Sequence, residues 1–400
     1  MARNRFVPAV TVKVINAPDI TASGLRYSSV HGNHEVAVLR TVDGWVNAET
    51  LPQGSPIHIT WANDFGSRNF YGYVHSHTKR DSMAAIFCVG ATWNLKTKGG
   101  QIWKNRTADM IVKEICRNAG LEAVTVPHPH VYKYFAQENL TYWGVLKFLA
   151  QQTGYVLHAD GTRVYFVPWD YWVQHQQGLS PYFLQNSSGG QTGQADSTLV
   201  EFIPDMADNH VDAGASAEQA IVTGVDSAGH PYVVVGAAAS TISGTARAVG
   251  ATTYSSSTLT DASLAKSISD AWASNNRFNY RANVVLAGNP LVQADMPLYL
   301  DGLGSSNGLW TALEVHHRFS IKGEYEIRGV VGSDGLPKVN KSMPAANQSS
   351  LTDGWKSTMP MNVETIKAGL TTPAKANLRS LEKVVLPTVV SGKTHRWSAT

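Results

Sequence analysis

The chain has 400 residues, 43% of them hydrophobic, which suffices for the cores of two or three domains. Its 34 Gly and 17 Pro favour short strands and turns over long helical bundles. The sequence has no apolar run long enough for a transmembrane helix and no signal-peptide pattern near residue 1, so we expect a protein made in the cytoplasm without an anchor.

The charge is distributed unevenly. Of the 33 Lys and Arg and the 30 Asp and Glu, nine and four lie in residues 334–400, which leaves 24 and 26 in residues 1–333. The mild basicity therefore belongs to the C-terminal segment, and the body lacks the net positive charge of a nucleic-acid-binding domain. Cys88 and Cys116 have no spacing typical of a zinc site or a disulfide scaffold, so we expect buried thiols.

Residues 7–100 have the pattern of short strands. Residues 9–15 and 55–61 alternate apolar and polar side chains, and the apolar segments 69–75 and 84–90 follow with a polar turn between them. Strands at this spacing predict a small antiparallel barrel or sandwich.

Two helices are predicted next, each with a start signal, an apolar stripe and a stop signal. In the first, Thr107 precedes Ala108, Ile111, Val112 and Ile115, and Gly120 follows; in the second, Thr141 precedes Tyr142, Val145, Leu146 and Leu149, and Gly154 follows. Asp160-Gly161, the dipeptide preferred in type I′ turns, then predicts a hairpin between residues 155–159 and 162–167. We interpret residues 101–168 as a unit that braces a neighbouring domain.

The second half returns to strands after a polar connection at residues 184–198. Strands are predicted at residues 199–203, 219–224, 280–287, 296–300, 309–319 and 323–331. Between them lies an excursion rich in Ala, Ser, Thr and Gly, which ends in a helix at residues 261–275 with Leu264, Ile268 and Ala271 on one face.

Residues 334–400 show no sustained period, so they form either a disordered tail or an extended arm along a partner. We favour the arm because it holds anchor-like side chains. The predicted partner-binding residues are Trp355, Met359, Met361, Val384, Val385 and Leu386.

Histidine pairs are the first candidates for chemistry. His128 and His130 flank a proline, which favours an extended loop over a metal site, and His316 and His317 point to opposite faces of a strand. His75 and His77 are expected on one face of a strand, as a possible ligand pair without an identifiable third ligand.

Carboxylates and tryptophans are the remaining candidates. Glu201 and Asp205, with the acidic residues Asp208 and Asp212, leave a glycosidase as an alternative hypothesis. Exposed tryptophans could stack sugars, although most of the 11 lie at periodic core positions. The chain has neither a nucleophile elbow nor a phosphate loop. We therefore expect no catalytic residues, no cofactor and no metal.

The order of these pieces resembles that of phage tail or baseplate hub proteins, namely the late control protein D family and the related N-terminal hub part of type VI secretion spike proteins. The likeness covers residues 7–333 and depends on residues 55–96, 106–126, 137–168, 264–304 and 309–332. Residues that match the family pattern are Gln137, Thr141, Trp143, Leu146, Leu149, Ala150 and Gly154, then Gly288, Pro290, Trp310, His316 or His317, and Tyr325.

Two departures from the family pattern stand out. Relatives often have Gly before the Met-Pro strand, where this chain has Ala294-Asp295, and the connection at residues 184–198 is unusually polar.

The resemblance implies an α+β, mainly β fold with two similar small antiparallel β-barrel domains, inserted helix-hairpin units and an extended C-terminal arm. The implied division is a first barrel (1–100), a helix-helix-hairpin insertion (101–183), a linker and first strands of the second barrel (184–224), an excursion with a helix (225–275), the rest of the second barrel (276–333) and the arm (334–400).

The resemblance also implies a non-enzymatic virion protein located at the tail tip. Three chains would present six barrels and adapt a sixfold tail tube to a threefold spike or fibre around a DNA-ejection channel. The implied partners are two further copies, the distal tail or tail tube protein, the tape-measure protein and a central spike or fibre protein, while DNA passes without specific binding. The alternatives are a cell-wall glycosidase and a carbohydrate-binding tail-tip module.

Overall fold

The computed structural model describes most of the chain up to Ser333. The described residues are 9–14, 17–80, 83–176, 181–184, 198–205, 219–225, 228–235, 251–255, 262–275, 278, 280–320 and 325–333. The predicted arm at residues 334–400 lies outside them.

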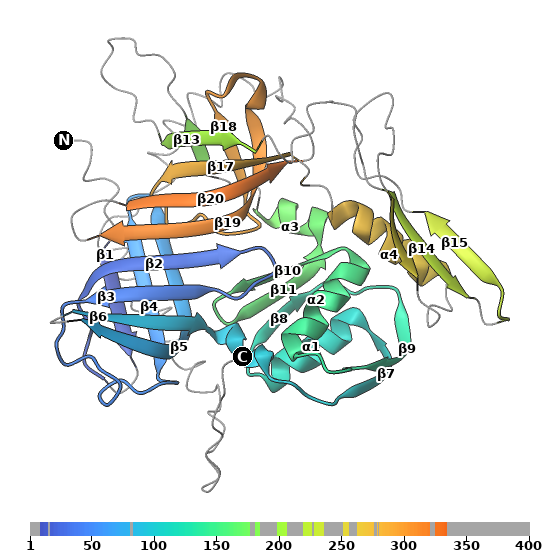
Figure 1. Ribbon diagram of the computed structural model, residues 1–400, viewed down its shortest axis with the longest axis horizontal. Helices are drawn as coiled ribbons and strands as arrows, with labels where there is room; N and C mark the ends of the chain where they lie inside the picture. The colour runs from blue at the N-terminus through green and yellow to red at the C-terminus, as the bar shows by residue number, and fades with distance from the viewer. Residues whose placement is uncertain are drawn as a thin grey trace, which may run out of the picture.

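Six strands form the first module, shown in blue in Figure 1. They are β1 (Ala9–Val14), β2 (Ala22–Val30), β3 (Val36–Thr41), β4 (Pro56–Asn63), β5 (Gly66–Arg80) and β6 (Met83–Gly90). Antiparallel pairing in the order β1-β4-β5-β6-β3-β2 curls the sheet, and a bridge between Val12 and Ile20 brings β1 back toward the start of β2. The predicted small antiparallel barrel therefore forms a curled sheet.

Alternating side chains fill the inside of the first module. In β3, Ala37 and Leu39 are buried, whereas Val36 and Arg40 are exposed. The core includes Leu25, Tyr27, Leu39, Ile59, Trp61, Phe70 and Ile86. This is the period-two burial expected of a sheet with one face on a core.

The second module consists of β12 (Tyr182–Leu184), β13 (Leu199–Pro204), β17 (Tyr280–Ala287), β18 (Pro297–Asp301), β19 (Gly308–Ser320) and β20 (Tyr325–Ser333), with the short 3-10 helix η4 (Gly304–Ser306). Its core includes Leu199, Val284, Leu286, Leu298, Leu300, Trp310, Val315 and Ile327. The predicted fold class, α+β and mainly β, is confirmed, and the structure shows the predicted barrels as curled antiparallel sheets.

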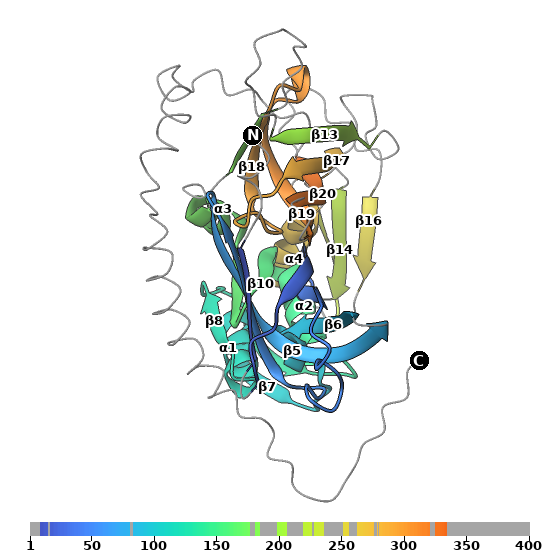
Figure 2. The ribbon, with the colours of Figure 1, turned by 90° about the vertical axis from the view of Figure 1, so that its left-hand side faces the viewer.

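One continuous sheet joins the two modules. β2 pairs with β19 from Glu314–Val30 to Ser320–Gly24, so the described strands run in the order β1-β4-β5-β6-β3-β2-β19-β20-β17-β13. Figures 1 and 2 show the orange strands of the second module continuing from the blue ones. Residues almost 300 positions apart in the chain thus share a backbone ladder.

The insertion between the modules packs beside the first one, to its right in Figure 1. It comprises η2 (Ala91–Lys96), β7 (Ile102–Thr107), α1 (Ala108–Asn118), β8 (Glu122–Thr125), β9 (Val131–Ala136), α2 (Tyr142–Thr153), β10 (Tyr155–Asp160), β11 (Arg163–Pro168) and α3 (Trp169–Gln176).

Both predicted helices of the insertion are confirmed. Thr141 Oγ1 accepts the Gly144 N–H at 3.0 Å, as a helix N-cap does, and Gly154 ends α2 with φ +69°. The predicted stripes of α1 and α2 lie in one shared core, in which Tyr142 is partly buried.

The β10–β11 hairpin turns one residue later than the sequence predicts. Asp160 pairs with Arg163, so Gly161 and Thr162 form the loop, and Gly161 alone has a positive φ, +59°. This is the pattern of a type II′ rather than a type I′ turn. The reason is tertiary, because Arg68 bonds Asp160 at 3.3 Å and Glu35 accepts the Gly161 N–H at 2.9 Å.

A small sheet and a helix form a further unit. β14 (Gln219–Val225) pairs with β15 (Pro231–Val235) and β16 (Ala251–Ser255), and α4 (Ala262–Asn275) packs on β14 and β15. Residues 219–224, which the sequence analysis groups with the second barrel, thus belong to a separate sheet, because Val222 packs on Ile268 of α4 instead. The predicted helix is confirmed, with Ile268 and Ala271 buried.

Gly154 tests the contact between α2 and α4. A Cβ at this position would meet the Ala271 Cα at 3.0 Å, whereas a Cβ at Gly54, which also has a positive φ, would meet nothing within 4 Å. Gly54→Ala should cost only the left-handed backbone strain, about 1–2 kcal/mol. Gly154→Ala should cost about 2–4 kcal/mol because overpacking against α4 is added. Thermal unfolding of both variants checks this, and equal costs would contradict the contact.

Candidate functional site

The β2–β3 turn, residues 31–35, contacts several separate units of the molecule. Gly32 has φ +60°, which permits the turn, and the Asn33 N–H donates to Val30 O at 3.0 Å. His31 bonds Asp295, and Asn33 bonds Lys147 of α2. His34 bonds Thr92 of η2. Glu35 bonds both Arg68 of β5 and Gly161 of the hairpin. The turn therefore fixes the modules and the insertion relative to one another.

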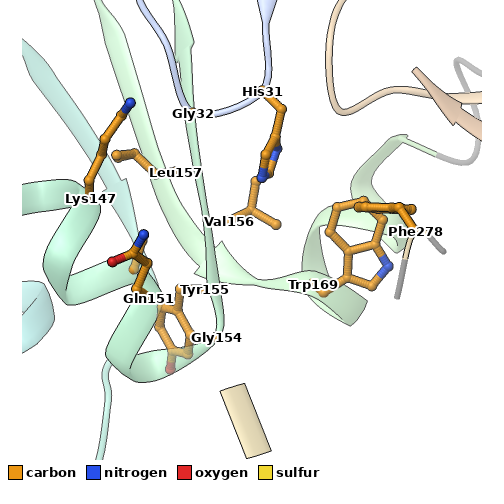
Figure 3. A pocket seen from close by; sticks show the side chains of 11 residues that line it. His31, Gly32, Lys147, Gln151, Gly154, Tyr155, Val156, Leu157, Trp169 and Phe278 are labelled. Atoms are coloured by element: carbon orange, nitrogen blue, oxygen red, sulfur yellow. The ribbon is translucent and has the colours of Figure 1, made fainter. Parts of the chain in front are cut away.

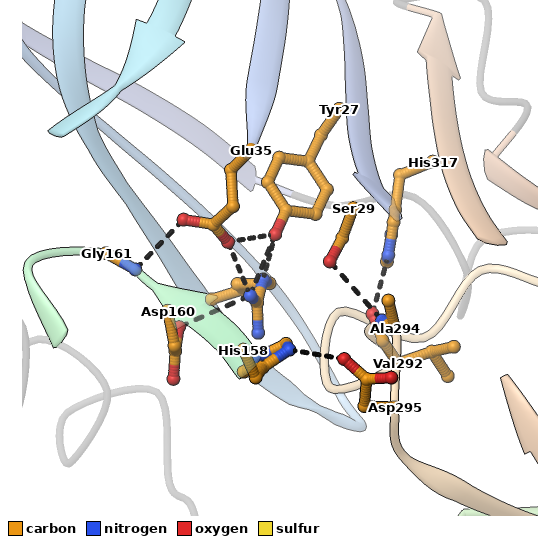
Figure 4. A network of polar contacts seen from close by, with 11 residues as sticks. Tyr27, Ser29, Glu35, His158, Asp160, Gly161, Val292, Ala294, Asp295 and His317 are labelled. Atoms are coloured by element: carbon orange, nitrogen blue, oxygen red, sulfur yellow. Dashed lines mark hydrogen bonds and ion pairs between the residues drawn. The ribbon is translucent and has the colours of Figure 1, made fainter. Parts of the chain in front are cut away.

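A buried ionic cluster surrounds Glu35 (Figure 4). Its carboxylate accepts hydrogen bonds from the Tyr27 hydroxyl, from Arg68 at 2.8 Å and from the Gly161 N–H at 2.9 Å. Arg68 is 8% exposed and Glu35 2%, and the Arg68 guanidinium also reaches Asp160 at 3.3 Å. Burial raises the pKa of Tyr27 well above its usual value, so Tyr27 remains a hydrogen-bond donor.

Asp295 forms a second buried joint. Its carboxylate bonds His31 Nδ1 through one oxygen and His158 Nδ1 at 2.9 Å through the other. The main chain of Asp295 also takes part in this joint. Its backbone N–H donates to Ala312 O at 2.7 Å, and its backbone carbonyl accepts the Trp172 indole N–H at 2.7 Å. One residue thus connects both modules and the insertion.

The electrostatics of Asp295 follow from this geometry. The side chain is fully buried, and burial alone would raise its pKa, but His31 and His158 hold the pKa below its usual range. Asp295 has φ +64°, a backbone conformation that favours Gly and tolerates Asp. The departure from the family pattern at this position therefore adds a carboxylate without losing the turn.

His317 marks the boundary between the two cores. Its Nε2–H donates to Val292 O at 2.8 Å, and Nδ1 accepts the Tyr325 hydroxyl proton at 2.7 Å. Tyr325 in turn accepts the Trp61 indole N–H at 3.2 Å. Burial lowers the pKa of His317 to about 3, so the ring is neutral. His316 is about half exposed, which confirms that the two rings face opposite sides of the strand.

The other predicted histidine pairs differ from expectation. The prediction that His75 and His77 share a face is wrong, because a bulge between Val74 and Ser76 places His77, not His75, on the face of Ile86 and Cys88. His128 is buried rather than at the surface, and its N–H donates to Asp109 at 3.3 Å. No group of three or more His, Cys, Asp or Glu within the described ranges could hold a metal ion.

Within the described residues, the glycosidase and sugar-binding candidates do not form a site. Glu201 is exposed on β13 and Asp205 follows that strand, while Asp208 and Asp212 lie outside the described residues. Among the tryptophans whose side chains the structure describes, five are buried (Trp61, Trp103, Trp143, Trp172, Trp310) and three are half-buried (Trp45, Trp93, Trp169). None of these eight side chains provides an exposed platform for a sugar.

An open cleft of about 260 Å³ lies beside the Asp295 joint (Figure 3). The cleft is lined by His31, Gly32, Lys147, Ala150, Gln151, Gly154, Tyr155, Val156, Leu157, Trp169 and Phe278. This lining contains one histidine, one lysine and aromatic rings but neither a carboxylate nor a thiol.

The predicted partner-binding residues cannot be placed. Trp355, Met359, Met361, Val384, Val385 and Leu386 lie in residues 334–400, outside the described ranges, and their role stays a prediction. Within the described segments, no helix is long and apolar enough to cross a membrane.

The joint residues were missed by sequence reasoning, although two of them carried a signal. Arg68 precedes Phe70 by two positions, so strand alternation places it on the core face. Asp295 stands where relatives often have Gly. Neither signal identifies Glu35, His31 or His158 as the partners.

Comparison with solved structures identifies the fold, whereas no family model and no curated protein matches the sequence. A tail protein from Neisseria meningitidis MC58 is similar with TM-score 0.58 and 10% identity over 83% of this chain and 98% of that one. A 43 kDa tail protein of prophage MuSo2 from Shewanella oneidensis matches with TM-score 0.54 and 11% identity over 82% of this chain and 99% of that one.

A third similar structure comes from a secretion system. It is an E. coli component of the type VI secretion system, described as structurally similar to the T4 bacteriophage tail proteins gp27 and gp5. It matches with TM-score 0.50 and 9% identity over 80% of this chain and 76% of that one. The chain thus has a tail-hub-like fold, which confirms the resemblance at the level of the fold.

Asp295→Asn tests the joint, because Asn keeps the left-handed backbone and removes the charge. We expect a loss of about 1.5–3 kcal/mol at pH 7. Since the folded-state pKa of Asp295 lies below its unfolded value of about 3.9, the stabilisation is present above that pH and lost as pH falls below it. The difference from wild type in thermal unfolding should therefore narrow below about pH 4.

Asp64→Asn is the control for this experiment, because Asp64 is an exposed carboxylate in the β4–β5 turn. It should change stability by less than about 0.5 kcal/mol. A loss in Asp295→Asn that stays constant from neutral to acid pH would contradict the charged joint.

Proposed function

We propose that the chain is a non-enzymatic structural protein of a phage-type tail, the hub at its tip. The observation that carries the proposal is the tail-protein fold, whose two curled modules are fused by the β2–β19 ladder and fixed by buried joints. Rigidity of this kind suits a part that transmits load between neighbours. The described part holds no assembled catalytic group that favours the glycosidase or carbohydrate-binding alternative.

The proposed assembly is a homotrimer. Two modules in each of three chains would give six β-walled units around an axis, so a threefold ring could meet a sixfold tube on one side and a threefold spike or fibre on the other. A cyclic interface of this type buries the same two surfaces in every copy and closes on itself. The modules would correspond to residues 1–100 and to 184–205 with 276–333, carrying insertions at 101–183 and 219–275, since β14 belongs to the separate sheet.

The proposed location is the tail tip of the virion, and the proposed neighbours are tail proteins. They are the distal tail or tail tube protein, the tape-measure protein and a central spike or fibre protein, with DNA passing through the channel at ejection. The insertion supports the modules, because its hairpin tip contacts Arg68 and Glu35 inside the first module.

Mass measurement tests the proposed stoichiometry. Light scattering or mass photometry should show three copies of the chain, either for the purified protein alone or in its complex with tail neighbours. A particle that contains a single copy in the tail would contradict the hub, and peptidoglycan release lost in Asp205→Asn would instead support the glycosidase.

Truncation tests the proposed arm. A chain that ends at Gly332 keeps both module cores, so it should unfold with nearly the wild-type midpoint. It should fail to assemble with tail neighbours, because Trp355, Met359, Met361 and residues 384–386 are removed. Normal assembly of the truncated chain would refute the role of the arm.

A further inference from the structure

Three arginines gather on the exposed face of the sheet where the two modules meet. Arg26 of β2 lies directly opposite Arg318 of β19, and Arg40 of β3 lies diagonally across from Arg26. All three side chains are exposed, on the face opposite the core residues Leu25 and Tyr27. We call this surface the arginine face.

The positive charge of the arginine face is largely uncompensated. Neither Arg26 nor Arg40 makes an ion pair with any residue in the described ranges. Glu326 lies 3.6 Å from Arg318 but also bonds Arg328 at 3.1 Å, so one carboxylate serves two guanidinium groups. Like charges directly opposite each other destabilise a sheet. The fold therefore gains nothing from this arrangement.

Two apolar side chains border the arginines. Phe87 of β6 pairs with Val38 of β3, and Val38 pairs with Arg26 of β2. This row of side chains across three strands therefore changes from apolar to positively charged. Phe87 is 40% exposed. These residues line a hollow of about 270 Å³. The hollow thus offers guanidinium donors beside an exposed aromatic ring.

We propose that the arginine face binds an extended protein segment in which carboxylates alternate with apolar side chains. Guanidinium groups bind carboxylates through paired hydrogen bonds, and the apolar side chains would cover Phe87 and Val38. The positive charge of the arginine face thus favours an acidic partner.

A nucleic acid fits this surface less well. Sites for single strands follow the backbone along a positive groove with several stacking rings, whereas these arginines converge on one hollow beside a single exposed ring.

This inference depends on the proposed hub function only in expecting the partner to be a tail protein. The arginine face is a property of one chain and does not require a trimer. A failed trimer test would therefore leave the inference standing, and a failed binding test would leave the trimer standing.

Fluorescence anisotropy with labelled probes tests the proposal on the full chain. The probes are a short peptide of alternating aspartate and leucine, a peptide of alternating lysine and leucine, and a thymidine oligonucleotide. We expect the acidic peptide to bind in preference to both others, and more weakly at high salt. The double variant Arg26→Gln, Arg318→Gln should lose at least about tenfold in affinity for it.

Two controls separate binding from folding. Arg163→Gln removes another exposed arginine, which is paired with Glu122 on the insertion, and should leave peptide binding unchanged. Arg26→Gln should unfold at or above the wild-type temperature, because it removes a repulsion. Peptide affinity unchanged in the double variant, a lowered unfolding temperature in Arg26→Gln, or oligonucleotide binding that is lost with the arginines would each overturn the proposal.

Discussion

Buried carboxylates hold this molecule in one arrangement. Glu35 and Asp295 each accept bonds from at least two separate units, and each lies almost or fully out of contact with water. A buried charge that loses a partner is costly, so the units cannot separate or slide without exposing one. The joints therefore specify a unique geometry, and the apolar cores on either side provide most of the stability.

The continuous sheet adds a second constraint of a different kind. Since β2 and β19 share backbone hydrogen bonds, the two modules turn together rather than about a flexible linker. His317 and Tyr325 fill the boundary between the cores with a neutral, fully bonded pair. The modules are therefore joined through backbone hydrogen bonds, an arrangement that suits the proposed hub.

The arginine face differs from the buried joints in the pairing of its charges. Core and joint residues have their charges paired, whereas Arg26 and Arg40 lack a described ion pair. Stability alone would favour removing one arginine of the Arg26–Arg318 pair. A surface whose like charges cost stability is typical of a binding site.

Local sequence determined the elements of this protein. Alternation identified the strands around Val12 and Ile59, and the capping residues Thr141 and Gly154 identified the limits of α2, because these signals act over a few neighbouring positions. Tertiary structure alone decided the turn at Gly161, the bulge that separates His75 from His77, and the partners of Asp295. Each of these depends on groups that are distant in sequence, so no local sequence pattern predicts it.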